Sequence, residues 1–103
     1  MNILWLIQHM ISNQQKQYKL IIEGHVQGVF FRKSSREKAI ALKINGWVKN
    51  TANNTVTMEI QGSQVHCDHM IKWCNKGPEK AVVTKITCIE EPLTLQKKGF
   101  EIL

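Results

Sequence analysis

The sequence has few of the features that mark a secreted or membrane-spanning chain. Its three cysteines are an odd number, and no two of them stand in a CxxC spacing. Such a set predicts free thiols and a reducing, cytoplasmic setting. Long apolar runs are also missing, because the run Ile3–Ile7 continues only raggedly to Ile11, too short to cross a membrane. It also lacks the basic start and small-residue cleavage site of a signal peptide, so we expect no membrane partner.

Acidic residues are scarce relative to basic ones. Fourteen lysines and arginines against eight acidic residues give a formal net charge of +6. This balance suits an anionic small molecule or nucleic acid equally well, so charge alone does not choose between them. The basic residues are spread along the chain, as on an ordinary solvated surface. At 103 residues, 43% of them hydrophobic, the chain is long enough for one domain with one core.

The first 17 residues differ in character from the rest. The apolar run Ile3–Ile7 is followed by the polar segment Ser12–Gln17, which is typical of a linker. We therefore predict a flexible N-terminal appendage over residues 1–17 and a single domain over residues 18–103, opening at Tyr18. The domain contains no internal repeat and no low-complexity segment.

Hydrophobic periodicity in the domain predicts the order β-α-β-β-α-β with a short final strand. The expected strands cover residues 18–23, 46–50, 56–60, 81–89 and 99–102, and the expected helices cover residues 32–43 and 64–76. Ser63 can cap the second helix, and residues 51–54 form a turn. This order is typical of an α+β, ferredoxin-like sandwich: an antiparallel sheet with two helices on one face.

The stretch Gly24–Arg32 carries the main functional signal. Two glycines, Gly24 and Gly28, bracket a loop between a predicted strand and a predicted helix, and Arg32 stands where the helix opens. Unpaired N–H groups and the helix dipole favour an anion there, and a guanidinium matches phosphate oxygens. We predict that the loop binds a phosphoryl group through Val26, Gln27, Gly28, Val29, Phe30, Phe31 and Arg32. The alternative, a surface arginine, is disfavoured because a helix N-terminus repels a cation unless an anion is present.

Two segments together resemble the acylphosphatase family. One is the pattern GxVQGVxFR over Gly24–Arg32, and the other is the pattern GWVxN over Gly46–Asn50. The resemblance continues through Gly77-Pro78 to Gly99–Ile102, so it covers residues 18–103. It implies a ferredoxin-like fold and hydrolysis of the carboxyl-phosphate bond of acyl phosphates, with no metal and no organic cofactor.

The same resemblance implies roles for two residues. Arg32 would bind the phosphate and Asn50 would position the attacking water, while His25 stands where the family usually has arginine or lysine. An acyl phosphate has a good leaving group, so the protein must mainly position the reactants and stabilise charge. We see no obvious general base, and the phosphate itself would accept the water proton, as proposed for the family. We expect a monomer whose partners are a small acyl phosphate substrate and inorganic phosphate as product and inhibitor, with no nucleic acid.

Two other functions fit part of the sequence. RNA-recognition motifs share this topology, but they stack bases on aromatic residues of the central strands. The expected central strand, residues 55–60, has no aromatic residue, and the first strand has only Tyr18. A phosphoprotein-binding module would keep Arg32 without needing Asn50, which would then be only a turn residue beside Thr51.

A zinc site is the remaining alternative. Candidate ligands cluster on the second expected helix: His66, Cys67, His69 and Cys74. Only some of them share a helix face, and no second ligand cluster accompanies them, so we predict no metal site. Cys67 and Cys74 are expected to pack as small apolar residues. Trp47 and Trp73 are expected in the core or at its edge.

Overall fold

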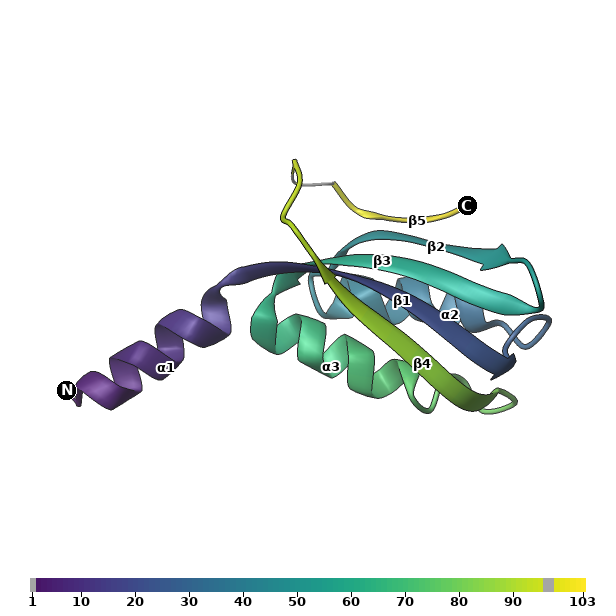
Figure 1. Ribbon diagram of the computed structural model, residues 1–103, viewed down its shortest axis with the longest axis horizontal. Helices are drawn as coiled ribbons and strands as arrows, with labels where there is room; N and C mark the ends of the chain where they lie inside the picture. Colours follow the sequence, from purple (N-terminus) through teal and green to yellow (C-terminus); the bar gives the residue numbers. More distant parts are fainter. Residues whose placement is uncertain (1, 96–97) are drawn as a thin grey trace.

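A five-stranded sheet covered by helices on one face forms the body of the protein (Figure 1). The computed structural model describes residues 2–95 and 98–103, and these form three helices and five strands. The helices are α1 (Ile3–Asn13), α2 (Phe31–Ala41) and α3 (Gln64–Cys74). The strands are β1 (Gln15–His25), β2 (Asn45–Thr51), β3 (Thr55–Ser63), β4 (Val82–Glu91) and β5 (Phe100–Ile102). Part of the expected loop before the last strand, residues 96–97, lies outside the described residues.

The strand order β4-β1-β3-β2-β5 confirms the predicted ferredoxin-like sandwich, with α2 and α3 on the same face (Figure 1). The sheet is antiparallel between β4, β1, β3 and β2, as expected, and only the short edge strand β5 pairs in parallel, with β2. A parallel neighbour requires a crossover, and the chain makes one from β4 at one edge to β5 at the other. Bonds from Gly46 N to Gly99 O, 2.9 Å, and from Leu103 N to Val48 O, 2.9 Å, hold this edge together.

The core lies between the sheet and its two helices. Residues at helical spacing face inward, and the buried ones are Phe31, Ser35 and Ala39 on α2 and Cys67, Met70 and Cys74 on α3. From the sheet, alternate residues such as Leu20, Ile22, Met58 and Ile60 are fully buried against them. The predicted cap is confirmed, since the Ser63 hydroxyl accepts a hydrogen bond from the His66 N–H at 3.3 Å.

The predicted linker over Ser12–Gln17 is wrong. Ser12 and Asn13 end α1, and β1 already begins at Gln15. Gln17 is only 3% exposed, and its side-chain oxygen accepts hydrogen bonds from Gln61 Nε2 (2.9 Å), Thr94 N (3.1 Å) and Thr94 Oγ1 (2.9 Å). The polar composition did not reveal that Gln17 is buried, because its hydrogen bonds are satisfied by polar partners inside the fold.

Helix α1 extends away from the sandwich (Figure 1), and none of its residues is buried. It has 11 residues, and no helix in the described part of the chain is long and apolar enough to span a membrane. The flexibility of the appendage and the division of the chain into residues 1–17 and 18–103 stay predictions.

The two tryptophans considered above lie on opposite faces of the sheet. Trp73 is half-buried and packs against Phe31 with ring centroids 5.6 Å apart. Trp47 points away from the helices, and the Lys49 ammonium lies 5.2 Å from its ring centroid.

Candidate active site

The loop between β1 and α2 has an unusual backbone. Gly24 has a φ of 129°, and a Cβ there would lie 2.0 Å from the Val82 carbonyl oxygen, so the position requires glycine. Gly28, at φ 73°, and Phe30, at φ 62°, are both left-handed and are separated by Val29. Alternation between left-handed and ordinary backbone turns successive N–H groups to one side, which suits an anion.

The start of α2 is left without a cap. Phe30 is the N-cap residue, it offers no side-chain hydrogen bond, and the first turn holds no acidic residue. By contrast, Asn2 caps α1 and Ser63 caps α3 through their side chains. Among the described residues, no cap side chain therefore accepts from the first N–H groups of α2, and the helix dipole favours a negative charge there.

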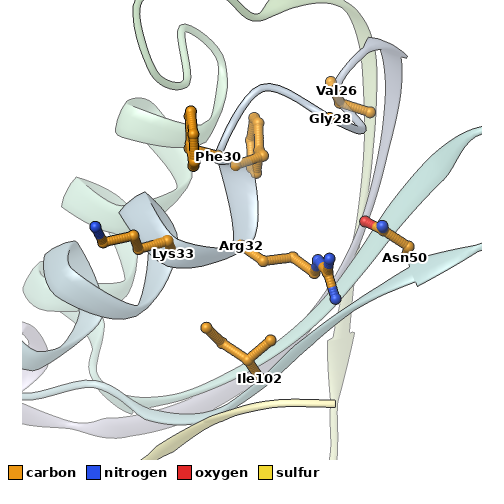
Figure 2. A pocket seen from close by; sticks show the side chains of 8 residues that line it. Val26, Gly28, Phe30, Arg32, Lys33, Asn50 and Ile102 are labelled. Carbon is orange, nitrogen blue, oxygen red and sulfur yellow. The ribbon is translucent and has the colours of Figure 1, made fainter.

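Arg32 and Asn50 come from distant parts of the sequence and enter one pocket. Arg32 lies in the first turn of α2, and Asn50 is the penultimate residue of β2. Figure 2 shows the Arg32 guanidinium pointing toward Asn50. The pocket has a volume of about 320 Å³ and is lined by Val26, Gly28, Phe30, Phe31, Arg32, Lys33, Asn50 and Ile102.

Both side chains are available to a ligand. Arg32 is half-buried and Asn50 is exposed, and neither makes a side-chain hydrogen bond or ion pair within residues 2–95 and 98–103. Among the described residues, no acidic side chain lines the pocket. An uncompensated guanidinium and a free amide therefore face the same space, and both can bind an oxyanion.

Two of the predicted loop residues do not line the pocket. Val29 is 5% exposed and belongs to the core. Gln27 points its side-chain nitrogen at the β2–β3 hairpin, where it donates to the carbonyl oxygens of Thr51 (3.1 Å) and Thr55 (2.8 Å). It thereby fixes the loop relative to the strand that carries Asn50.

Sequence reasoning missed two pocket residues. Lys33 directly follows Arg32, so its place near the pocket could have been predicted from the sequence. The place of Ile102 could not, because it depends on the parallel pairing of β5 with Val48 of β2, for which the sequence carries no local signal.

The cysteines lie outside this pocket. Burial raises the pKa of the Cys67 thiol to about 12 and also raises the pKa of the Cys74 thiol. Burial first, and the nearby Asp68 second, raise the pKa of Cys88. All three thiols are free and protonated near neutral pH, so they are not suited to act as nucleophiles. No group of three or more potential metal-binding side chains occurs in the part of the chain that the structure describes.

Comparisons with known proteins agree on one family. The acylphosphatase family profile matches residues 18–102. The chain is 37% identical over 91 residues to the acylphosphatase of Rubrobacter xylanophilus, covering 88% of this chain and 83% of that protein.

Two solved structures are similar as well. An acylphosphatase from Coxiella burnetii gives a TM-score of 0.82 at 30% identity, covering 86% of this chain and 93% of that one. The acylphosphatase from Bacillus subtilis also gives 0.82 at 30% identity, covering 85% of this chain and 98% of that one.

Proposed function

The chain belongs to the acylphosphatase family, and on that basis we propose how its pocket acts: Arg32 and the loop amides bind the phosphoryl group, and Asn50 orients the attacking water. The enzyme hydrolyses the carboxyl-phosphate bond of acyl phosphates to a carboxylate and inorganic phosphate. The comparisons give no support to an RNA-binding module.

The phosphate side of the proposal rests on the start of α2. Its uncapped N–H groups, together with the N–H groups of the left-handed loop, are suited to donate hydrogen bonds to the three equatorial phosphoryl oxygens. Arg32 adds planar, charged donors that can bind two of these oxygens at once. These donors stabilise the charge that develops as the bond to the carboxylate breaks.

The water side of the proposal rests on Asn50. Its amide oxygen can accept a hydrogen bond from the water while its amide nitrogen donates one to a phosphoryl oxygen. The water oxygen then forms a bond to phosphorus as the bond between phosphorus and the acyl oxygen breaks, and the electron pair leaves with the carboxylate. The water proton passes to a phosphoryl oxygen, so the pocket needs no separate base.

The single observation that carries the proposal is that Arg32 and Asn50 line one pocket (Figure 2) and that neither side chain has a partner among residues 2–95 and 98–103. The test is hydrolysis of synthetic acetyl phosphate by the full chain in the presence of a chelator, with inorganic phosphate added as a competitor. We expect turnover that the chelator does not change and that phosphate inhibits competitively. Glycerol phosphate, whose alkoxide is a poor leaving group, should not be hydrolysed. Loss of activity with chelator, or no effect of phosphate, would contradict the proposal.

We further propose that the enzyme acts as a monomer in the cytoplasm, with small molecules as the only partners of its pocket. Its three free cysteines support a reducing compartment. Sedimentation of the full chain over a concentration series tests the monomer, and a mass that rises with concentration would contradict it.

A further inference from the structure

Helix α1 carries an apolar stripe that faces water. Four apolar side chains recur at the spacing that places them on one face of the helix: Ile3, Ile7, Met10 and Ile11. They are exposed, Ile3 by 69% and Met10 by 71%. Between Ile3 and Asn13 the sequence has no acidic residue, no lysine and no arginine. An uncharged stripe of this kind is more stable out of water, so it marks a surface that meets another apolar medium.

Local contacts hold α1 in this exposed position. The side-chain oxygen of Asn2 accepts a hydrogen bond from the Leu4 N–H at 2.9 Å and caps the start of the helix. The rings of Trp5 and His9, one turn apart, stack with their centroids 5.1 Å apart. A helix of 11 residues is marginal in water by itself, and these contacts favour it before any partner binds.

The second half of α1 meets the body of the protein. The Gln64 N–H at the start of α3 donates to the Gln14 carbonyl oxygen at 2.8 Å. A groove of about 210 Å³ lies between the two helices, and its α1 side is lined by Gln8, Ile11 and Ser12. Figure 1 shows the rest of α1 projecting on the side of the sheet that carries α2 and α3. A flat surface on that side can therefore meet α1 and the other two helices together.

Helices α2 and α3, with the turns that follow them, form a basic layer. This layer, residues 31–43 and 64–80, contains eight lysines and arginines and three acidic residues. Its exposed side chains include Lys33, Lys72 and Lys76. Among the strand residues on the opposite face of the sheet, three lysines are matched by four glutamates: Lys19, Lys49, Lys85, Glu23, Glu59, Glu91 and Glu101. The helix side of the molecule thus carries most of the net charge of +6.

Length and area limit what can cover the apolar stripe. With 11 residues, α1 is about 16 Å long, roughly half of what a helix needs to cross a bilayer. Two helices of this length packed side by side bury less than the roughly 800 Å² per partner of a stable dimer. The expectation of no membrane partner rested on the length of the apolar run and on the missing signal peptide. Neither observation bears on a helix that lies in the plane of a lipid surface.

We propose that α1 and the basic layer together form a docking surface for an anionic lipid bilayer. Helix α1 lies along the bilayer with its stripe among the upper acyl chains, and the lysines of the layer sit over the lipid headgroups. Such binding gains both from the buried apolar area and from attraction to anionic lipids. Trp5, which is 52% exposed, is suited to the interface, where tryptophan concentrates. The inference goes beyond the proposed function and does not depend on it, since it assigns no new role to Arg32 or Asn50.

The experiment is sedimentation of the full chain with vesicles. One kind contains phosphatidylglycerol and phosphatidylcholine in equal parts, and the other contains phosphatidylcholine alone. We expect binding to the mixed vesicles to be stronger by about 10-fold or more, and added salt should reduce the difference. Tryptophan emission should shift to shorter wavelength on binding, and Trp5→Phe should remove most of that shift.

Matched variants separate the stripe from general stickiness. Ile7→Gln should weaken binding to the mixed vesicles by about 10-fold, because its apolar side chain no longer enters the bilayer. The control is Ile89→Gln, since both isoleucines are 46% exposed but Ile89 pairs with Lys19 on the opposite face of the sheet. Ile7→Leu keeps an apolar side chain and should bind like the native protein. Neither change at Ile7 should alter the melting temperature, because α1 buries no residue.

Three results would overturn the inference. The first is a failure to bind the mixed vesicles, or equal binding to both kinds of vesicle. The second is the same binding by Ile7→Gln and Ile89→Gln, which would assign the attraction to surface charge alone. The third is a mass that doubles with concentration in the absence of vesicles and stays single in Ile7→Gln, which would make a second copy of the chain the partner of the stripe.

Discussion

The side-chain nitrogen of Gln27 donates a hydrogen bond to the carbonyl oxygen of Thr51, 3.1 Å away. Thr51 directly follows Asn50, so this bond joins the phosphate loop to the strand end that carries the proposed water-positioning residue. A second bond from the same nitrogen, to Thr55 O at 2.8 Å, reaches across the hairpin. The two halves of the pocket are therefore fixed to each other by one side chain.

Gln27→Ala should loosen this connection. Leaving two part-buried carbonyl groups without their donor should lower the free energy of unfolding by about 1–3 kcal/mol. It should also lower kcat by roughly 10-fold, because small displacements between reacting groups are expensive in rate. Urea denaturation and acetyl phosphate kinetics measure the two effects. The matched control is Gln8→Ala, an exposed change on α1, which should alter neither the free energy of unfolding nor kcat. An unchanged kcat in a destabilised Gln27→Ala would show that the bonds serve stability alone.

Arg32→Lys should weaken phosphate binding by roughly 10-fold or more, because an ammonium cannot replace two parallel guanidinium donors. Calorimetric titration with inorganic phosphate measures this directly. Arg36→Lys makes the same change one helical turn further along, where the side chain bonds to Phe100 O and does not line the pocket. It should leave phosphate affinity unchanged. Equal affinities for the native protein and Arg32→Lys would place the phosphate elsewhere.

Asn50→Ala should lower kcat by about 100-fold while phosphate affinity changes much less, because the residue orients the nucleophile rather than binding the phosphate alone. Asn50→Asp should also lower kcat, since a carboxylate would repel the phosphoryl group. The control is Asn53→Gly in the neighbouring turn, where a φ of 62° makes glycine acceptable. A parallel loss of kcat and phosphate affinity in Asn50→Ala would assign Asn50 to binding.

Two truncations separate α1 from β1. Deleting residues 1–13 should leave kcat nearly unchanged and cost little stability, because α1 buries no residue. Deleting residues 1–17 should cost more than about 2 kcal/mol, because it also removes the Gln17 side chain that joins Gln61 to Thr94. Thermal melts of the two proteins give the comparison. Equal melting temperatures would show that the domain begins at Tyr18 after all.

Alkaline pH should destabilise the fold through its buried thiols. Burial raises the folded pKa of Cys67 to about 12 from an ordinary 9.0. Between these values the unfolded chain loses the proton and the folded chain keeps it, so the free energy of unfolding falls as pH rises above 9. Below pH 9 the thiol is protonated in both states, so the full stability is retained there. Urea midpoints at pH 8 and 10.5 measure the fall, which should be smaller in Cys67→Ala. An identical fall in that variant would assign the effect to other groups.

The parts of the site that depend on local sequence were predictable. A glycine-bracketed loop before a helix, followed by the segment that ends at Asn50, was enough to select two residues that the fold brings to one pocket. Ile102 was not predictable in this way, because it reaches the pocket through strand pairing across a distance of many residues. Gln17 was missed for a different reason: a buried polar side chain is indistinguishable in composition from an exposed one until its partners are known.

The position of the edge strand β5 also determines which end of the chain can carry a tag. Its last paired residue, Ile102, lines the pocket, and Leu103 is bonded to Val48 directly beside it. Anything fused after Leu103 would emerge next to the entrance that substrates use. The other end of the chain projects from the tip of α1, on the far side of the sandwich (Figure 1). An affinity tag or fluorescent label attached there leaves the entrance open, whereas the same tag after Leu103 would obstruct the pocket that Ile102 lines.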